Sequence, residues 1–416
     1  MPFYLIQGGR PLEGSLPVHG AKNAVLPILA AATLCSDCVL EGCPRLSDVE
    51  VALDILRHLG CYAAWQDDSI VTRQAVGGSC RVPSQLMSAM RSSIVFLGAT
   101  LSRFGCAEFT LPGGCELGSR PIDLHLKALT AMGAVIDEQG GSLFCSTPNG
   151  LHGAEILLPF PSVGATENIL IAAATAKGQT VLRGGAREPE ITDLIAFLRG
   201  CGALIETAIN GDVTINGVKA LGGCHHRIIP DRIAAGTFLA AAAVTGGQLE
   251  LTGIRPAHLL STLAVLSNAG CTVTAGTDRV RLVAPRRLRE LGVIKTGPYP
   301  GFATDMQAIT MAVATLCEGN TIFVENIFDN RYRHVAQLVR LGAQIVCQGR
   351  TAVVTGVTQL HGASLRCTDL RGGAALVVAA LAAEGESVLT ELQHIERGYQ
   401  RFDESIRQLG GRIIKG

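Results

Sequence analysis

The sequence predicts an α/β protein of two domains, each made of three repeated units whose helices are buried and whose sheets lie outside. First, a glycine that follows an amphipathic run recurs six times at spacings of 73, 69, 68, 72 and 68 residues, as Gly60, Gly133, Gly202, Gly270, Gly342 and Gly410. Second, the units contain runs that are apolar on every face, as at 169–175, 237–244 and 374–381. Such helices are buried. We therefore expect six units of about 70 residues.

The elements of one unit are expected in a constant order. The apolar helix ends at a turn with Gly or Asp and leads into a strand, as at 178–183. An amphipathic helix follows, with Ile191, Leu194 and Leu198 at helical spacing. Its terminal glycine then leads into a second strand, as at 203–206.

The length of the chain favours two globules over one. A domain of about 210 residues is of ordinary size, whereas a single core for all 416 residues is unusual. We expect the two domains to meet near residues 225–230. The segment before Gly20 precedes the first buried helix, and the pattern alone assigns it to neither half.

The composition argues against nucleic-acid and membrane partners. Lys plus Arg and Asp plus Glu both number 35, so there is no net charge to attract a polyanion. The first residues lack a basic segment followed by a long apolar stretch, and no run of about 18 apolar residues occurs. We expect a cytoplasmic protein. The sequence does not predict its oligomeric state.

Most of the fourteen cysteines lie in apolar segments, as Cys145 and Cys347 do. This is typical of core residues in a reducing compartment. Cys35 and Cys38 form the only pair with CxxC spacing. Because there is no second pair and few histidines lie nearby, we expect core packing there, with a zinc site as the alternative. No metal site is expected.

Polar residues recur at one position of the buried helices. Fourteen residues before the turn that ends each helix lie Asn23, Arg91, Gly164, Arg232, Asp305 and Arg371. These are predicted first-turn positions. A cation there opposes the helix dipole, so Arg91, Arg371 and neighbouring Lys22 are expected to need an anion. The alternative is ordinary ion pairing with Glu188, Glu190, Asp231 or Asp369.

The amphipathic helices repeat this pattern with Arg120, Arg331 and Arg397 at their predicted starts. Pro121 has the first-turn preference of proline and places Arg120 at a helix N-terminus. Helix N-termini with arginines bind phosphate and carboxylate. If symmetry points these termini one way, the cations of both domains face a shared cleft.

Two further residues suggest acid–base chemistry. Cys115 lies in a glycine-rich loop, and Arg120 is expected to lower the pKa of its thiol, favouring proton exchange or nucleophilic attack. The alternative is a loop cysteine without a role. Asp305 is the one carboxylate at the repeated helix-start position and is suited to accept a hydroxyl proton. Helix capping is its alternative, although Thr304 could also cap.

The motifs that contain these residues resemble the UDP-N-acetylglucosamine enolpyruvyl transferase family nearly end to end. They lie at residues 20–27, 90–93, 111–115, 118–125, 186–190, 230–232, 304–307, 330–331, 368–371 and 395–399. The resemblance implies a pair of inside-out α/β barrels, residues 21–229 and residues 1–20 plus 230–416, with the active site in the cleft between them. It also implies transfer of the enolpyruvyl group of phosphoenolpyruvate to the 3-hydroxyl of UDP-N-acetylglucosamine, with release of phosphate. This is the first committed step of peptidoglycan synthesis and needs no metal or organic cofactor.

The resemblance also implies residue roles. Cys115 is the proton donor to the enol methylene and forms an adduct with phosphoenolpyruvate, and Asp305 is the base. Lys22, Arg120 and Arg397 hold the phosphate, and Arg331 and Arg371 hold the carboxylate. The nucleotide-sugar site is implied to contain Asn23, Arg91, Arg120, Pro121, Ile122, Asp123, Leu124, Ser162, Val163 and Ile327. Phe160, Pro161 and Ala303 depart from the family pattern and put local nucleotide contacts in doubt.

Two alternatives remain at this point. The sister family, 5-enolpyruvylshikimate-3-phosphate synthase, shares this fold and chemistry but is expected to have Ser-Lys-Ser at the first helix, where this chain has Ala21, Lys22 and Asn23. It is also expected to have a turn like Asn-Ala-Gly-Thr at residues 90–93, where the sequence is Met-Arg-Ser-Ser. The other alternative is a non-catalytic paralogue that binds a UDP-sugar. Phosphate release with each substrate pair separates the three.

Overall fold

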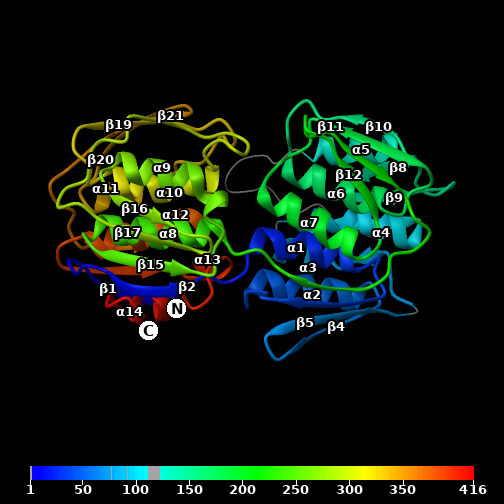
Figure 1. Ribbon diagram of the computed structural model, residues 1–416, viewed down its shortest axis with the longest axis horizontal. Coiled ribbons are helices and arrows are strands. Elements are labelled where there is room, and N and C mark those ends of the chain that lie inside the picture. Colours follow the sequence, from blue (N-terminus) through cyan, green and yellow to red (C-terminus); the bar gives the residue numbers. More distant parts are fainter. Residues whose placement is uncertain (1, 76, 91, 111–121) are drawn as a thin grey trace. The chain divides into compact units, whose positions relative to one another are not determined.

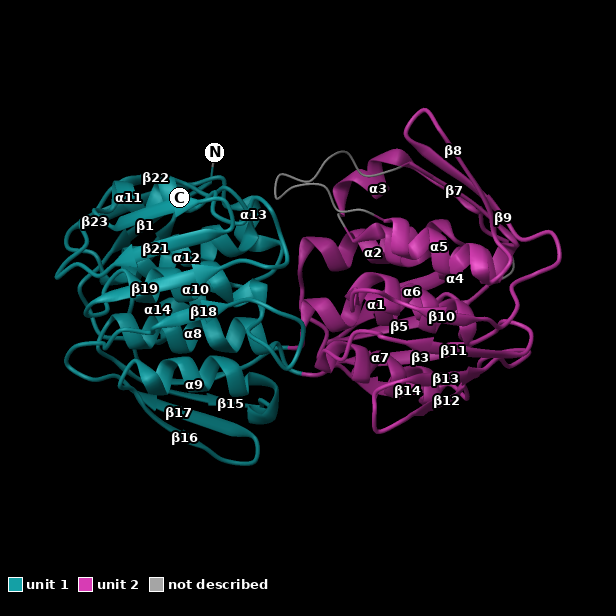
Figure 2. Ribbon diagram, turned by 90° about the horizontal axis from the view of Figure 1, so that it is seen from above, with its two compact units in different colours: residues 1–19, 116–118, 230–416 teal, residues 20–115, 119–229 magenta. Residues whose placement is uncertain are grey.

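The computed structural model describes residues 2–75, 77–90, 92–110 and 122–416. Its chain forms two compact units, shown in different colours in Figure 2. Among the described residues, unit 1 contains residues 2–19 and 230–416, and unit 2 contains residues 20–110 and 122–229. Four predicted site residues, Arg91, Cys115, Arg120 and Pro121, lie outside the described residues.

Three apolar helices form the centre of unit 2. They are α1 (Lys22–Ala32), α4 (Phe96–Phe104) and α6 (Val163–Ala173), and each contacts the other two. Their alanine-rich faces are buried on nearly every side, as the all-apolar pattern predicts. The amphipathic helices are α2 (Ser47–His58), α5 (Asp123–Ala131) and α7 (Pro189–Gly200), and two short helices are α3 (Ser84–Ala89) and η1 (Ser93–Val95).

The described strands of unit 2 form three four-stranded sheets outside these helices. In each sheet one edge strand is parallel to its neighbour and the other pairs are antiparallel. The sheets, in spatial order, are β14 (Cys224–Arg227), β3 (Asp37–Glu41), β5 (Ser69–Gln74) and β4 (Cys61–Gln66); β6 (Arg81–Val82), β7 (Cys106–Thr110), β9 (Ser142–Ser146) and β8 (Val135–Gln139); and β10 (Glu155–Leu157), β11 (Gln179–Arg183), β13 (Val213–Asn216) and β12 (Leu204–Thr207).

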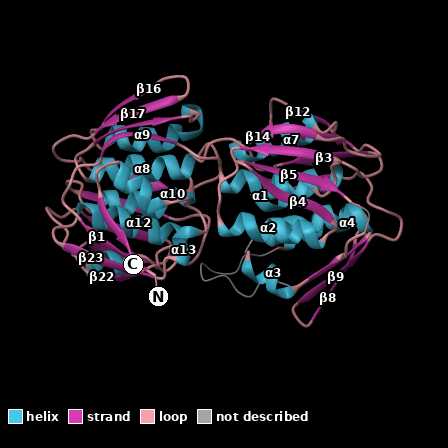
Figure 3. Ribbon diagram, turned by 90° about the horizontal axis from the view of Figure 1, so that it is seen from below, coloured by secondary structure: helices cyan, strands magenta, loops and turns pink. Residues whose placement is uncertain are grey.

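Unit 1 repeats this plan. Its central helices are α8 (Arg232–Val244), α10 (Thr304–Ala314) and α12 (Leu370–Ala382), which contact one another inside the strands (Figure 1). The other helices are η2 (Pro256–Leu259), α9 (Leu260–Asn268), α11 (Val335–Arg340), α13 (Gln393–Glu396) and α14 (Phe402–Gln408). The buried-helix arrangement expected from the sequence is thus present in both units, as the colouring of Figure 3 makes clear.

The described strands of unit 1 also form three sheets. In spatial order these are β22 (Ser364–Arg366), β23 (Glu386–Thr390), β1 (Phe3–Gln7) and β24 (Arg412–Lys415); β16 (Thr272–Ala275), β17 (Arg279–Val283), β15 (Gln248–Thr252) and β2 (Glu13–Pro17); and β18 (Val293–Lys295), β19 (Asn320–Val324), β21 (Thr351–Thr355) and β20 (Gln344–Gln348). The N-terminal strands β1 and β2 therefore complete two sheets of unit 1.

The repeated glycines have the backbone that the pattern requires. All six, from Gly60 to Gly410, have φ between 78° and 95°, a region in which a residue with a Cβ is strained. Each allows a helix to end and the chain to turn into a strand. Within the described residues, no helix is both long enough and apolar enough to cross a membrane.

The predicted helix starts are confirmed at five of the six buried helices. Asn23, Gly164, Asp305 and Arg371 are second residues of their helices, and Arg232 is a first residue. The sixth position, Arg91, lies outside the described residues.

Two predicted starts of amphipathic helices are wrong. Arg331 lies in turns ahead of α11, where Val335 N–H donates to Tyr332 O in a four-residue turn. Arg397 follows α13, and the left-handed backbone of Arg401 separates it from α14.

Candidate active site

Three predicted site residues meet in unit 1, around the carboxylate of Asp305. Arg331 Nη2 lies 3.2 Å from Asp305 Oδ1. Arg371 donates to Asp305 Oδ2 from Nη2 at 2.9 Å and from Nε at 3.2 Å. Both arginine side chains are almost wholly buried, whereas the Asp305 side chain is 29% exposed. The carboxylate is therefore oriented by two guanidiniums and still reachable from solvent.

Helix packing explains how distant residues meet. Asp305 and Arg371 each occupy the first turn of a central helix, and α10 packs against α12. Asp369 caps α12, where its Oδ1 accepts from the N–H groups of Arg371 and Gly372. This cap satisfies the helix N-terminus with a carboxylate, which favours a cation in the same turn. Arg331 enters from the turn before α11 and donates to Thr304 O at 3.0 Å.

Arg371 retains capacity to bind a ligand. Among the described residues its Nη1 has no hydrogen-bond partner, although the atom is buried. Its guanidinium lies 5.4 Å from the centre of the Tyr399 ring, and the Tyr399 hydroxyl contacts Thr237 Oγ1. Burial disfavours the charge, but Asp305 and Tyr399 outweigh it and hold the Arg371 pKa above its usual value. A buried donor without a partner is costly unless a ligand accepts from it.

Glu325 is a buried residue of the site that sequence analysis missed. Its Oε2 accepts from Thr304 Oγ1 at 3.0 Å, and its Oε1 accepts from Ile327 N at 2.8 Å. Thr296 Oγ1 donates to the same Oε1 at 2.9 Å. A carboxylate placed directly after the apolar strand residues 322–324 is the sequence feature that could have identified Glu325 as a site residue. Glu325 thereby positions Ile327, which was predicted to touch the nucleotide sugar.

The capping interpretation of Asp305 does not hold. The N-cap residue of α10 is Ala303, and it makes no side-chain capping bond. The Thr304 hydroxyl is directed to Glu325, and the Asp305 carboxylate is directed to the two arginines. Ion pairing of Arg371 was expected with residues such as Asp369. Arg371 does form an ion pair, but its guanidinium donates to Asp305, whereas Asp369 accepts from its backbone N–H. Arg397 is half-buried at the end of α13 in the same unit.

Lys22 and Asn23 begin α1 of unit 2. Lys22 Nζ lies 2.6 Å from Asp48 Oδ2, and the exposed fractions of the two side chains are 12% and 4%. Asp48 lies in the first turn of α2, which packs against α1. Lys22 is therefore a largely buried cation at a helix N-terminus, held by a carboxylate that sequence analysis did not consider as its partner.

The other described residues of the predicted nucleotide-sugar site lie at the starts of α5 and α6. Ser162 caps α6 by accepting from Ala165 N at 3.4 Å, and Val163 follows it, half-buried. Ile122 precedes α5, where Asp123 pairs with Lys127 at 3.0 Å and Leu124 is half-buried. Of the residues that depart from the family pattern, Phe160 is exposed, Pro161 is half-buried and Ala303 precedes α10.

A buried histidine links α5 and α6. Asn168 Nδ2 lies 2.8 Å from His125 Nδ1, and Asn168 Oδ1 accepts from Gly98 N at 2.7 Å. Burial lowers the pKa of His125 to about 4. The neutral imidazole of His125 therefore has a structural role, because its contact with Asn168 joins α5 to α6.

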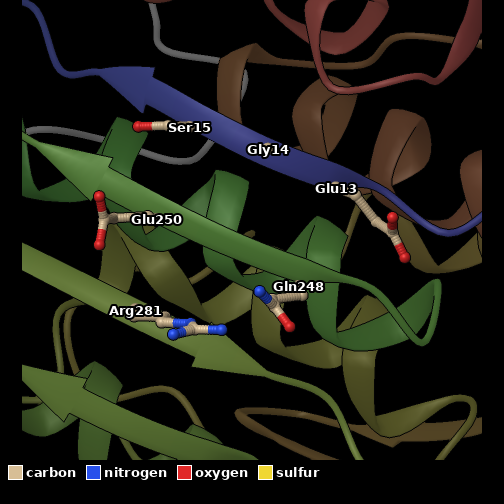
Figure 4. A pocket seen from close by; sticks show the side chains of 6 residues that line it. All are labelled: Glu13, Gly14, Ser15, Gln248, Glu250 and Arg281. Carbon is tan, nitrogen blue, oxygen red and sulfur yellow. The ribbon is translucent and has the colours of Figure 1, made fainter.

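A polar hollow on unit 1 is unrelated to the predicted residues. It lies over β2, β15 and β17 and is lined by Glu13, Gly14, Ser15, Gln248, Glu250 and Arg281 (Figure 4). None of these side chains belongs to the predicted catalytic or binding set. The backbone of Gly14, without a side chain, forms part of its floor.

Comparisons with known proteins identify the family of the chain. The family model of EPSP synthase (3-phosphoshikimate 1-carboxyvinyltransferase) matches residues 6–406. The chain is 44% identical to UDP-N-acetylglucosamine 1-carboxyvinyltransferase 2 of Caldanaerobacter subterraneus, with all of both chains covered. It is 46% identical to UDP-N-acetylglucosamine 1-carboxyvinyltransferase 1 of Symbiobacterium thermophilum, covering 99% of this chain and 95% of that protein.

Solved structures show the same fold. The enolpyruvyl transferase NikO from Streptomyces tendae superposes with a TM-score of 0.91 at 26% identity, covering 100% of this chain and 98% of that one. EPSP synthase from Acinetobacter baumannii superposes with a TM-score of 0.76 at 18% identity, covering 100% and 99%. The second likeness concerns the fold alone.

Proposed function

The chain belongs to the EPSP synthase family, and within it to the UDP-N-acetylglucosamine 1-carboxyvinyltransferases, and we propose that it transfers the enolpyruvyl group of phosphoenolpyruvate to the 3-hydroxyl of UDP-N-acetylglucosamine. The products are the enolpyruvyl ether and inorganic phosphate. This reaction commits the sugar nucleotide to peptidoglycan synthesis.

One observation carries the proposal for the chemistry. Asp305 presents a partly exposed carboxylate between two buried guanidiniums, and one of these has a buried nitrogen without a partner among the described residues. Phosphoenolpyruvate has a carboxylate that matches such a donor, and the sugar hydroxyl has a proton that a carboxylate can accept. The arrangement supports an anionic substrate bound beside a base.

The reaction is an addition followed by an elimination. Cys115 donates a proton to the methylene carbon of phosphoenolpyruvate, which leaves an oxocarbenium-like centre at the adjacent carbon. The sugar oxygen bonds to that carbon as Asp305 takes the hydroxyl proton. The Cys115 thiolate then takes a proton back from the new methyl group while the carbon–oxygen bond to phosphate breaks, which restores the double bond and releases phosphate. Atoms balance without a metal or an organic cofactor.

The remaining residues bind substrate. We assign the phosphate to Lys22, Arg120 and Arg397, and the carboxylate to Arg331 and Arg371. Fixed cations that face the developing phosphate charge stabilise the transition state more than the ground state. The assigned nucleotide-sugar residues are Asn23, Arg91, Arg120, Pro121, Ile122, Asp123, Leu124, Ser162, Val163 and Ile327.

The substrate is tested by phosphate release from phosphoenolpyruvate. We expect turnover with UDP-N-acetylglucosamine and none with shikimate 3-phosphate. Turnover with shikimate 3-phosphate alone would assign the sister activity. Binding of the UDP-sugar without turnover would assign a non-catalytic role.

We place this reaction in the cytoplasm. All thirteen described cysteines are unpaired thiols, which suits a reducing compartment. Cell fractionation with an antibody to the chain tests the location, and recovery in the membrane pellet would contradict it.

A further inference from the structure

Four cysteines far apart in the sequence meet at one place in unit 2. The sulfur atoms of Cys35, Cys38 and Cys201 all lie within 4.8 Å of one another. Cys201 Sγ lies 3.3 Å from Cys224 Sγ. Cys38 and Cys224 are paired in register across two neighbouring parallel strands. Three sulfur atoms therefore lie around a common centre, and the fourth, Cys224 Sγ, lies beside that of Cys201.

Three separate features of the fold produce this cluster. Cys35 lies in the turn after α1, and Cys38 follows in β3, where it stands in register with Cys224 of the parallel strand β14. Cys201 ends α7, and its carbonyl accepts from Gly222 N at 2.8 Å. A Cβ on Gly223 would lie 1.7 Å from Asp37 O, so only glycine permits these backbones to approach so closely.

The cluster is shielded from solvent. Cys35, Cys38 and Cys201 are at most 2% exposed, and Cys224 is half-buried. Sequence analysis predicted core packing for the Cys35–Cys38 pair because no second pair followed it. The tertiary structure brings the other two sulfurs to the pair. Burial of Cys35 and Cys38 is compatible both with core packing and with a structural metal site.

We propose that Cys35, Cys38, Cys201 and Cys224 bind one Zn²⁺ ion as a tetrahedral thiolate site. Zinc–sulfur bonds of about 2.3 Å place tetrahedral ligands roughly 3.8 Å apart. Three of the sulfurs lie within 4.8 Å of one another, and Cys224 Sγ lies 3.3 Å from that of Cys201, so small side-chain movements complete the site. The Cys35–Cys38 spacing is the one common in structural zinc sites. An iron–sulfur cluster does not fit, because sulfurs this close leave no room for several iron and sulfide atoms.

The ion would join the first repeat of unit 2 to its third. Cys35 and Cys38 belong to the first repeat, and Cys201 and Cys224 belong to the third, whose last strand β14 completes the sheet of the first. Lys22 begins α1 and Cys35 follows the end of the same helix, so about 15 Å of helix separates the ion from the phosphate-binding lysine. The ion is therefore structural, and no catalytic step passes through it.

Metal content provides the direct test. The full-length chain is purified under reducing conditions without chelator, and zinc is measured by mass spectrometry. We expect about one zinc ion per chain. Cys38→Ser and Cys224→Ser are expected to lower the zinc content at least roughly tenfold. Cys145→Ser is the matched control, because Cys145 is a buried thiol of the same unit outside the cluster, and it should retain the ion.

A cobalt titration makes the test independent of the metal acquired in cells and of whether the variants fold. The wild-type chain is stripped of metal under reducing conditions and titrated with Co²⁺. We expect the intense visible bands of a tetrahedral cobalt–thiolate site, saturating at about one ion per chain and lost when Zn²⁺ is added. Absence of both zinc and these bands would overturn the proposal.

Counting the free thiols separates the zinc site from its two alternatives, a disulfide and core packing. Unfolded, metal-free chain purified without reductant should show all fourteen thiols. Twelve thiols, with the two missing ones assigned by peptide mapping to the cluster and not to the neighbouring thiols Cys80 and Cys106, would indicate a disulfide within the cluster, and that result would overturn the proposal. Fourteen thiols in a chain that binds neither ion would indicate core packing alone, which would also overturn it.

Discussion

Arg371 donates two hydrogen bonds to one oxygen of Asp305, from Nη2 at 2.9 Å and from Nε at 3.2 Å. The two residues are 66 positions apart in the chain, on neighbouring central helices. The pairing stabilises the carboxylate charge and fixes its direction, while Arg331 holds the other oxygen. In the proposed role of Asp305 as the base, this orientation means that little reorganisation is needed when the carboxylate accepts a proton.

Asp305→Asn is expected to lower kcat at least about 100-fold, because the amide cannot accept the hydroxyl proton. The KM for phosphoenolpyruvate should change much less. Steady-state phosphate release measures both values. Asp278→Asn is the control, since Asp278 is an exposed carboxylate of the same unit. Wild-type kcat in Asp305→Asn would assign the base elsewhere.

Arg371→Lys is expected to raise the KM for phosphoenolpyruvate at least roughly tenfold, because an ammonium cannot contact Asp305 and a substrate carboxylate in the planar geometry of a guanidinium. Titration calorimetry with phosphoenolpyruvate checks the loss of affinity. Arg366→Lys changes an exposed arginine of the same unit and should be neutral. Equal affinities in the two variants would contradict the role of Arg371.

Lys22→Ala is expected to reduce both stability and activity. It leaves the buried Asp48 carboxylate without Lys22, and breaking a buried ion pair costs about 3–5 kcal/mol. Denaturant unfolding should therefore show a lower midpoint. The double variant Lys22→Ala with Asp48→Ala should recover part of the stability but none of the activity. Recovery of activity in the double variant would show that Lys22 is only structural.

Cys115→Ala is expected to abolish turnover, because no other group is proposed to protonate the enol. Thermal unfolding should match that of the wild type. Cys347→Ala replaces an exposed cysteine and should leave turnover unchanged. Retained activity in Cys115→Ala would mean that another group donates the proton.

Stability should fall on acidification through His334. Burial lowers its pKa to about 4, with Arg331 acting in the same direction and Asp369 opposing it. Between about pH 6.5 and 4 the unfolded chain gains a proton that the folded chain refuses, so the free energy of unfolding falls, on the order of 3 kcal/mol in all.

In His334→Leu this part of the pH dependence should disappear, while in His225→Leu, which changes an exposed histidine, it should remain. Denaturant unfolding at several pH values measures the difference. A His334→Leu profile parallel to that of the wild type would show that other groups cause the acid sensitivity.

Much of the fold follows from local patterns. A glycine with positive φ ends each amphipathic helix, and apolar runs form the central helices because such surfaces must leave water. The spacing from the turn that ends each apolar run also predicts that Asp305 and Arg371 lie in the first turn of their helices. The start at Arg331 was mispredicted because the chain forms turns there before α11 begins at Val335. The start at Arg397 was mispredicted because the left-handed backbone of Arg401 separates it from α14.

By itself, the sequence determined the six-unit repeat, the buried helices and the family, and it singled out Asp305, Arg331 and Arg371 as candidate site residues. The tertiary structure alone decided that Asp305 contacts both Arg331 and Arg371, that Glu325 supports Thr304, and that Lys22 pairs with Asp48. It alone brought Cys201 and Cys224 to the Cys35–Cys38 pair. Periodicity reports which face of an element is buried, but the partner of a side chain depends on which distant elements pack together.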